Sequence, residues 1–349
     1  MSLQRFPGFV DVHTHLREPG ATHKEDFYTG SRAAIAGGFT FIIDMPNNPR
    51  ATISKERLEE KISLSNQKAL CEIGFHFGTN GKNIEEFTYA IASPKVFGLK
   101  VYCNHTTGEM LIEDSVLLEE VFSMWQSNKP ILVHAEGDRL NIALKLAEKH
   151  KRRLHVCHIS QASEVELVRR AKLSGMSITA GATPHHLFFY EILNHEKLGN
   201  YGIVKPPIKT KEDGEALWQG MKDGTIDIIE TDHAPHTREE KEKDPPAYGV
   251  PGLETALGLM FKAVKDGRIQ ESDVVKFLYT NPKKIFNISD QPGTYVELDS
   301  QKKYIVGASG YETKCGWSPF EGMTLYGKPE TVVFRGKKVL EHGKIVIEK

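Results

Sequence analysis

The sequence is poor in cysteine, balanced in charge and free of long hydrophobic runs. Its 349 residues include four widely separated cysteines and no C-x-x-C pair, so neither a disulfide framework nor a cysteine-rich zinc site is expected. The 45 basic and 46 acidic residues leave a net charge of −1, which gives no electrostatic footprint for nucleic acid or an anionic membrane. No apolar run approaches the roughly 18 residues of a membrane span. The N-terminal residues show no signal-peptide pattern, so we expect a cytoplasmic protein.

What the chain does contain is an alternation of strand-like and helix-like segments. Amphipathic segments with apolar residues three or four apart are typical of helices, and they occur at 55–70, 112–126, 137–150 and 161–175. Short β-rich runs are predicted strands, at 8–13, 39–44, 71–78, 96–102, 130–134, 153–158, 176–181 and 226–231.

This alternation predicts an α/β fold of parallel βαβ units. Eight strands favour a TIM (β/α)8 barrel over residues 8–290. The main rival is an open doubly wound sheet, but no G-x-G-x-x-G follows the first strand to support dinucleotide binding. The segment 291–349 alternates with period two and, with residues 1–7, predicts a small β appendage formed mainly by the C-terminal segment. The proline-rich stretch 239–252 is predicted to be a polar loop.

Histidine is the anomaly, because several of the 15 histidines lie within apolar strand-like runs. His13 and His15 close the first strand, and side chains that alternate across a strand place both on one face. Two imidazoles at this spacing can chelate a metal ion. The plainer interpretation is two exposed polar residues at a strand end.

The fourth strand carries an inward-facing lysine. Lys100 is flanked by Leu99 and Val101, which alternation assigns to the helix-facing side, so the amine points into the barrel. An unpaired buried ammonium costs several kcal/mol. A neutral amine is one solution. Carboxylation by CO₂ is another, because it gives a carbamate anion that can bridge two cations.

Three more candidate ligands end the fifth, sixth and eighth strands: His134, His158 and Asp232. The six candidates thus fall at the C-terminal ends of five strands, where barrel enzymes build their sites. For any single histidine a hydrogen-bonded core imidazole is the simpler interpretation, but coincidence explains the set poorly. Nitrogen and oxygen donors suit zinc, with manganese or cobalt as substitutes. Two metals bridged by hydroxide would supply a nucleophile and a Lewis acid for a carbonyl.

A series of motifs extends along nearly the whole chain, from about residue 8 to 340. They are DVHTHLREPG (11–20), MPN (45–47), GLKVY (98–102), VHAE (133–136), HVCH (155–158), TPHHL (183–187), TDHAPH (231–236) and GVPGLET (249–255). In these motifs the chain resembles the dihydroorotases of the amidohydrolase superfamily, above all the dihydroorotase part of animal-type multifunctional pyrimidine enzymes. The resemblance implies an enzyme of de novo pyrimidine biosynthesis that reversibly cyclises N-carbamoyl-L-aspartate to L-dihydroorotate.

The resemblance also implies roles for single residues. One zinc ion would be held by His13, His15 and Asp232, and a second by His134 and His158. Carboxylated Lys100 and a hydroxide would bridge the two ions, and Asp232 would also shuttle the proton. The implied substrate contacts are Arg17, Asn47 and His236 for the carboxylate, Thr106 and Thr107 in the loop 103–109, and Lys205, Pro251 and Gly252.

Physical chemistry supports part of this substrate set. A guanidinium recognises a carboxylate with two parallel hydrogen bonds, and Arg17 lies two residues beyond the histidine pair. The plainer interpretations are a surface salt bridge for Arg17, a turn residue for Asn47 and a loop histidine for His236.

Three positions depart from the family pattern. Lys205 stands where relatives have Asn or Arg, and a lysine offers no bidentate contact. Gly181 stands where some animal-type members have a glutamate that assists an additional metal. Because Cys157 is also expected to face away from His158, we predict no third metal. Glu230 is expected to point inward, where a small residue is usual, but the sequence does not identify its partner.

Two other functions remain open at this point. Another cyclic amidohydrolase, such as an allantoinase or a hydantoinase, would act on substrates without this carboxylate, so Arg17, Asn47 and His236 argue against it. A non-catalytic homologue that scaffolds aspartate transcarbamoylase is disfavoured by the complete ligand set. We expect a homodimer with a small-molecule substrate, without nucleic-acid or membrane partners. The resemblance suggests an association with aspartate transcarbamoylase.

Overall fold

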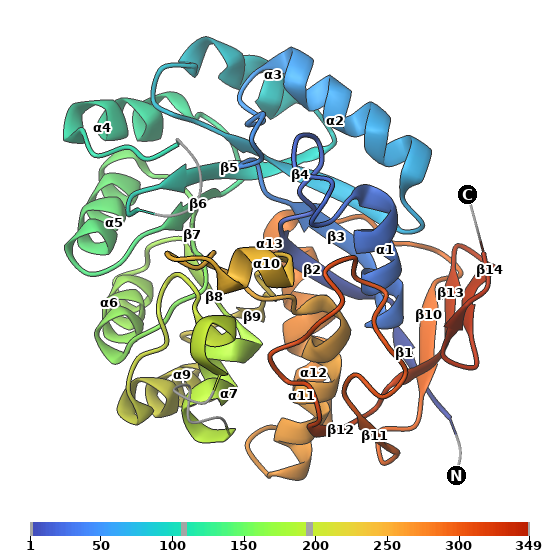
Figure 1. The fold of residues 1–349 in the computed structure, drawn as a ribbon. Helices are drawn as coiled ribbons and strands as arrows, with labels where there is room; N and C mark the ends of the chain where they lie inside the picture. Colours follow the sequence, from blue (N-terminus) through green and yellow to red (C-terminus); the bar gives the residue numbers. More distant parts are fainter. Residues whose placement is uncertain (1–2, 106–109, 193–197, 348–349) are drawn as a thin grey trace.

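The predicted barrel is present in a computed structural model, which describes residues 3–105, 110–192 and 198–347. Its strands are parallel and lie side by side in chain order from β2 to β9 (Figure 1). Their bounds are β2 (Phe9–Thr14), β3 (Phe39–Asp44), β4 (Glu72–Gly78), β5 (Val96–Tyr102), β6 (Ile131–His134), β7 (Leu154–Val156), β8 (Ile178–Ala182) and β9 (Ile228–Ile229). The strands therefore match the eight predicted runs, with the eighth reduced to two residues.

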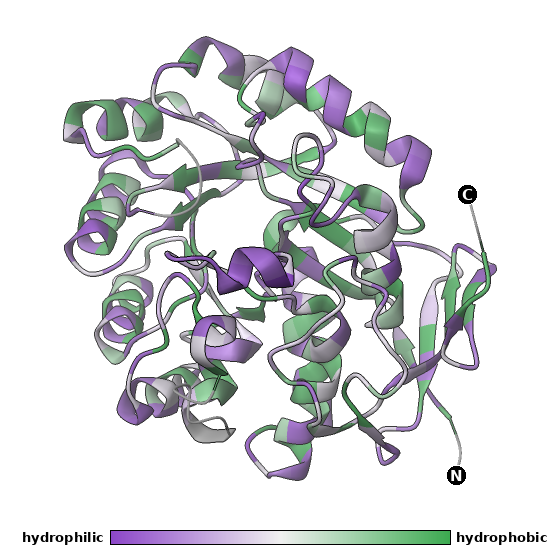
Figure 2. Ribbon diagram, in the orientation of Figure 1, coloured by the Kyte–Doolittle hydropathy of each residue, from purple (hydrophilic) through white to green (hydrophobic). Residues whose placement is uncertain are grey.

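Helices between the strands cover the outside of the barrel (Figure 1). The longer ones are α1 (Phe27–Ala36), α2 (Lys55–Lys68), α4 (Ser115–Met124), α5 (Asp138–His150), α6 (Ala162–Leu173), α7 (Pro184–Ile192), α9 (Lys211–Asp223) and α11 (Leu253–Lys265). Shorter ones are α3 (Phe87–Ala92), α10 (Arg238–Glu242), α12 (Glu271–Val275) and α13 (Asn281–Phe286). The four predicted helices correspond to α2, α4, α5 and α6. Figure 2 shows hydrophobic and hydrophilic residues on the same helices, as one-sided burial requires.

The two faces of strand β5 are both buried but have different surroundings. Leu99 and Val101 of β5 are fully buried in the main hydrophobic core, which also contains residues of the surrounding helices. Lys100 between them is equally buried, but it lines a cavity inside the barrel. The alternation predicted for this strand is confirmed, and it is what delivers a polar group to the barrel interior.

The barrel closes beside the candidate site rather than along a full strand. Because β9 has only two residues, its contact with β2 comes from the segment that follows it: Thr14 forms a parallel bridge with His233. The backbone N–H of His15 donates to the carbonyl of His233 at 2.8 Å. Asp11 adds a side-chain connection by accepting the N–H of Thr231 at 3.1 Å. These bonds fix the last strand end against the first.

The appendage is a separate antiparallel sheet at one side of the barrel, where both ends of the chain lie (Figure 1). Its order is β1-β10-β13-β14-β15, so the N-terminal strand is paired with C-terminal ones as predicted. The bounds are β1 (Gln4–Pro7), β10 (Tyr295–Leu298), β13 (Pro329–Phe334), β14 (Lys337–Glu341) and β15 (Lys344–Ile345), with a separate pair β11 (Lys303–Ile305) and β12 (Thr324–Tyr326). The domain boundary near residue 290 remains a prediction.

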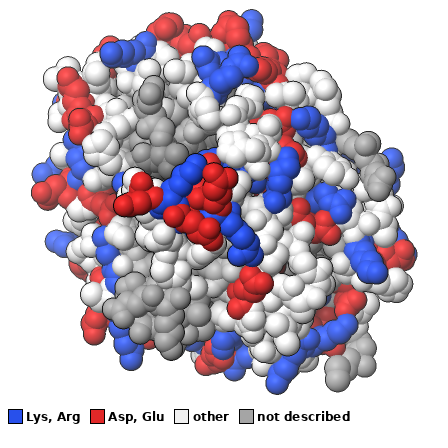
Figure 3. Space-filling model, in the orientation of Figure 1, with Lys and Arg blue, Asp and Glu red and all other residues white. Residues whose placement is uncertain are grey.

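The helices and the surface charges bear on the expected partners. Within residues 3–105, 110–192 and 198–347, no helix has the length and apolar character to cross a membrane. Figure 3 shows both charge signs dispersed over one face, with a mixed cluster at the centre over α10.

The stretch 239–252 was predicted to be a loop, but it begins inside α10. Thr237 caps this helix by accepting the N–H of Glu240, a local arrangement that favours a helical turn.

Candidate active site

The six predicted metal ligands lie together at the C-terminal ends of the barrel strands, where all of them line one cavity of about 30 Å³. Three belong to strands, namely His13 in β2, Lys100 in β5 and His134 in β6, and three lie one to three residues beyond a strand end, namely His15, His158 and Asp232. His158 and Asp232 have left-handed backbones, with φ of 35° and 46°. Such conformations are strained and cluster at functional sites.

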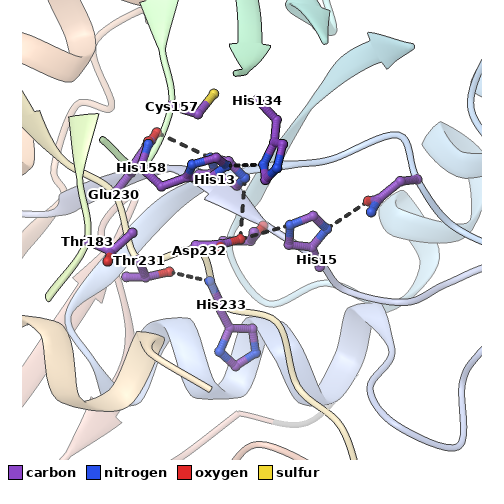
Figure 4. A network of polar contacts seen from close by, with 12 residues as sticks. His13, His15, His134, Cys157, His158, Thr183, Glu230, Thr231, Asp232 and His233 are labelled. Carbon is purple, nitrogen blue, oxygen red and sulfur yellow. Dashed lines mark hydrogen bonds and ion pairs between the residues drawn. The ribbon is translucent and has the colours of Figure 1, made fainter. Parts of the chain in front are cut away.

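His13, His15 and Asp232 form the first half of the site (Figure 4). Oδ1 of Asp232 lies 2.9 Å from Nε2 of His15 and 3.4 Å from Nε2 of His13. The opposite ring nitrogens have their own partners: Nδ1 of His15 lies 2.8 Å from Oδ1 of Asn47, and Nδ1 of His13 lies 3.3 Å from Oε2 of Glu230. Both rings therefore present Nε2 to the same carboxylate.

Lys100, His134 and His158 form the second half of the site. Nδ1 of His134 faces Nε2 of His158 at 3.0 Å, as Figure 4 shows. Nζ of Lys100 lies 3.2 Å from Sγ of Cys157. Among the described residues, no carboxylate lies within salt-bridge distance of this fully buried amine.

Cys157 does not face away from the site, so that prediction was wrong. Its thiol contacts Lys100, and its Sγ lies within 4.8 Å of ligand atoms of His13 and Glu230. Regular pairing in β7 ends at Val156, and the left-handed backbone of His158 breaks the alternation. Cys157 and His158 can then both point into the barrel, where Cys157 packs with apolar residues and His158 lines the cavity. The reason for excluding a third metal therefore no longer holds.

Glu230 points inward as predicted, and the structure identifies its partners. Oε2 lies 3.3 Å from ring nitrogens of both His13 and His155, and Oε1 accepts the backbone N–H of His158. Burial alone would raise the pKa of Glu230, but its contacts with His13 and His155 hold that pKa well below its usual range. The carboxylate is therefore ionised and fully buried.

The protonation states suit metal binding. Burial, more than any neighbouring charge, lowers the pKa of His15 to about 4 and that of His134 to about 3. The pKa of His158 is also lowered well below its usual value, chiefly by burial. Burial would raise the pKa of Asp232, but His13 and His15 hold it well below its usual range. Neutral imidazole and ionised carboxylate are the forms that bind metals.

The spacing of the donors also fits metal ions. Two ligand atoms on a tetrahedral zinc ion with bonds of about 2.0–2.1 Å are separated by about 3.3 Å. The separations of Asp232 from His15 and His13 are 2.9 and 3.4 Å, and that between His134 and His158 is 3.0 Å. Each half therefore brackets a point that one ion can occupy, and the residues fit the implied metals.

The three residues predicted to bind a carboxylate lie next to the first half. Arg17 and Asn47 line the cavity together with the six ligands. His236 does not line it, but its Nε2 lies 3.2 Å from Nη2 of Arg17. Nε of Arg17 donates to the carbonyl of Pro235 at 3.1 Å. The guanidinium is buried rather than on the surface, so the surface salt-bridge interpretation of Arg17 was wrong.

A larger cavity of about 490 Å³ adjoins the ligand cavity and shares His15, Arg17 and Asn47 with it. Volumes of roughly 300–1,000 Å³ are typical of small-molecule pockets. Arg57 and Lys24 also line this space. A small anionic molecule therefore has room beside the metal ligands and basic groups around it.

Of the remaining predicted substrate contacts that the structure describes, one lines the ligand cavity and two do not. Lys205 lines the ligand cavity, with Nζ 4.3 Å from the ring centroid of Tyr248. Pro251 and Gly252 are buried and line neither cavity, and the N–H of Gly252 donates to Nδ1 of His233 at 3.1 Å. Thr106 and Thr107 lie outside the described residues.

Two buried carboxylates behind the site were missed at the level of sequence. Asp11 joins β2 to the segment after β9, as described above. Asp44, at the end of β3, accepts the N–H of Leu16 at 2.7 Å and pairs with Lys61 at 2.6 Å. Both acids lie in otherwise apolar strand runs, which is the same signal that singled out the histidines.

Comparison with known proteins places this geometry in context. The model of the amidohydrolase family matches residues 6–339. The chain is 40% identical over 349 residues to multifunctional protein CAD from Squalus acanthias, across 99% of this chain and 15% of that protein. It thus spans a small part of this relative. It is also 32% identical to a dihydroorotase from Methanosphaera stadtmanae, across 97% of this chain and 86% of that enzyme.

Solved structures give the same fold with differing activities. An L-hydantoinase from Arthrobacter aurescens superimposes with a TM-score of 0.93 at 26% identity, covering 99% of this chain and 87% of that chain. The inactive dihydroorotase-like domain of a CAD-like multifunctional protein from Chaetomium thermophilum matches with a TM-score of 0.82 at 25% identity, covering 99% and 97%. The fold therefore does not settle the activity, and the site has to decide it.

Proposed function

The chain belongs to the amidohydrolase family, and we propose that it is a dihydroorotase. It would reversibly cyclise N-carbamoyl-L-aspartate to L-dihydroorotate in de novo pyrimidine biosynthesis. The observation that carries the proposal is the lining of one cavity, in which the six metal ligands lie beside Arg17 and Asn47. A metal centre beside a buried guanidinium suits a cyclic amide that carries a carboxylate.

Metal dependence is expected from the family, and we propose two zinc ions per chain. His13, His15 and Asp232 would hold one, and His134 and His158 the other. When bound, such ions polarise a carbonyl and lower the pKa of a water molecule, so that a nucleophile exists near neutral pH.

Lys100 is proposed to be carboxylated and to bridge the ions. Lys61 offers an internal contrast, because it is equally buried but lies 2.6 Å from its counter-ion Asp44. Lys100 has no carboxylate at that distance among the described residues. Addition of CO₂ to its neutral amine, with release of one proton, gives the missing anion and removes the cost of an unpaired buried ammonium.

Asp232 is proposed to move the proton. During ring opening its carboxylate takes a proton from the attacking water and passes one to the departing ring nitrogen, working first as base and then as acid. The low pKa of Asp232 keeps it ionised before ring opening. Ring closure consumes one proton, because a carboxylate becomes a neutral imide, so acid favours closure and alkali favours opening.

Substrate recognition is assigned to the groups around the larger cavity. Arg17 and Asn47 would bind the ring carboxylate, with His236 holding the guanidinium. Lys205 would contribute charge without bidentate geometry, while Thr106, Thr107, Pro251 and Gly252 remain proposed contacts. We further propose a cytoplasmic homodimer. An association with aspartate transcarbamoylase is proposed because the animal-type relative is multifunctional.

The decisive experiment combines metal content with turnover. The purified chain should contain about two divalent ions, lose activity with a chelator and regain it with zinc. It should hydrolyse dihydroorotate far better than hydantoin. Preference for hydantoin would favour the second candidate function, a hydantoinase, which the TM-score of 0.93 with an L-hydantoinase supports. A metal-loaded chain without either activity would instead place it with the inactive homologue.

A further inference from the structure

Glu230 is a buried charge that the proposed reaction does not use. Its side chain is fully buried at the end of the barrel interior. One carboxylate oxygen lies 3.3 Å from Nδ1 of His13 and 3.3 Å from Nε2 of His155. The other accepts the backbone N–H of His158. A single acid therefore contacts a ligand of the first half and the backbone of a ligand of the second half.

The neighbouring strand leaves space for this acid. Gly181 in β8 lies beside Glu230, and a Cβ atom at position 181 would be 2.6 Å from Cδ and from Oε1 of Glu230. Real Cβ atoms do not approach other atoms so closely, so any larger residue at 181 would displace the carboxylate. The two unusual residues thus form one structural unit, in which the absent side chain of Gly181 makes room for Glu230.

We propose that Glu230 is a positioning residue for the metal centre, made possible by Gly181. Nδ1 of His13 is buried and makes no hydrogen bond to any described residue, so the carboxylate of Glu230, 3.3 Å away, is the charged group that it faces. Nε2 of the same ring is thereby turned toward Asp232, 3.4 Å away. Carboxylates that contact the outer nitrogen of a metal-binding histidine fix its tautomer and orientation. This inference rests on the proposed metal centre and adds the residue that orients its first ligand.

His155 explains why the acid stays in place. Nδ1 of His155 lies 2.9 Å from Oγ1 of Thr179, and its Nε2 contacts Glu230. The ring also packs against Phe286 with centroids 5.4 Å apart. His155, which is not one of the six proposed ligands, therefore holds the same carboxylate oxygen that contacts His13.

The first test measures zinc affinity by chelator competition in Glu230→Ala, Glu230→Gln and the wild type. The variants His15→Ala and His134→Ala each remove a ligand from one half of the site. Comparison with them shows which measured zinc affinity belongs to the first half and which to the second. Losing an outer partner of a ligand typically costs about 10–100-fold in affinity. We expect this loss for the first half in Glu230→Ala, a smaller loss in Glu230→Gln, and little change in the second half.

The matched control is Glu254→Ala. Glu254 is also a poorly solvated acid, accepting the N–H groups of Glu312 and Thr313, and among the described residues it contacts none of the six ligands. Its loss should lower the melting temperature without changing either zinc affinity. Equal affinities in Glu230→Ala and the wild type would overturn the inference. Three ions in the wild type and two in Glu230→Ala would also overturn it, because Glu230 would then be a ligand.

A second test uses the contact between Gly181 and Glu230. Gly181→Ala should weaken zinc binding in the first half and lower the melting temperature of the metal-free protein. In the Glu230→Ala background the same change should have almost no further effect, because the clash is gone. If the effects of Gly181→Ala and Glu230→Ala were additive, the two residues would act independently, and the proposed structural unit of Gly181 and Glu230 would be contradicted. A wild type without bound metal would refute the proposed function, whereas the outcomes above refute only the role of Glu230.

Discussion

The two halves of the metal site differ in how their ligands are held. In the first half, Asn47 contacts the outer nitrogen of His15 and Glu230 that of His13. In the second half, Nε2 of His134 and Nδ1 of His158 have neither a hydrogen-bond partner nor a carboxylate within ion-pair distance among the described residues. Within the same residues, Lys100 has the thiol of Cys157 as its polar side-chain contact. The first half is therefore organised by the protein, whereas the second half depends more on what binds there.

This difference predicts that the two halves bind their metal ions with different affinities. Ligands fixed by outer partners lose little conformational freedom on binding metal, so the first half should bind its ion more tightly. The second half contains the group whose charge must be created by carboxylation. We therefore expect loading of the second half to depend on CO₂, and the first half to stay metallated when CO₂ is scarce.

The largest effect is expected for Lys100→Ala, which removes the only ligand proposed to serve both halves. The ion content should fall from about two to at most one, and hydrolysis should fall by more than the roughly 10²–10⁴-fold of an acid–base group. Metal analysis, turnover and the mass of CO₂ on Lys100 check this. Lys61→Ala is the matched control: it should destabilise the protein but keep both ions. Two retained ions and full activity in Lys100→Ala would exclude the bridge.

Asp232→Asn should have the next largest effect. The amide can still contact metal but cannot accept a proton, so kcat for hydrolysis should fall by about 10²-fold or more while substantial metal remains. The measurement is kcat against pH for both proteins, with metal content determined in parallel. A fully metallated variant with nearly unchanged kcat and an unchanged acidic limb would rule out Asp232 as the shuttle.

Arg17→Ala tests whether the organised half also selects the substrate. Removing the charged partner of a buried carboxylate should cost about 2–5 kcal/mol in kcat/KM for dihydroorotate, with little effect on metal content. Arg57→Ala, at the larger cavity, is the control for general loss of positive charge and should have a much smaller effect. If Arg17→Ala retained its kcat/KM for dihydroorotate, the guanidinium would be structural only.

The smallest effect is expected for Asn47→Ala. Loss of the amide that contacts Nδ1 of His15 should weaken zinc binding by about 10-fold, at the lower end of outer-partner effects, in the first half alone. Asn48→Ala is the control, because Oδ1 of Asn48 accepts from Lys61 at 2.8 Å rather than from a metal ligand. Equal weakening of both halves would contradict the comparison between them.

The sequence alone predicted the barrel, because strand and helix periods and the repeated strand–helix order are local properties of the chain. Family membership and the fold were confirmed. The inward direction of Lys100 was also local, since alternation along one regular strand determines it. Cys157 shows the limit of this reasoning: the alternation fails where β7 ends and His158 takes a left-handed backbone.

Tertiary structure decided the contacts between strands. Glu230 and Gly181 appeared in the sequence as two unrelated departures, 49 positions apart by their numbers, and only the pairing of β8 with β9 shows that one makes room for the other. The same holds for Asn47, whose contact with His15 joins two separate strand ends. A linear sequence specifies which groups a strand carries and which face they take. The partner across the barrel depends on register and closure, which arise only when all the strands pack together.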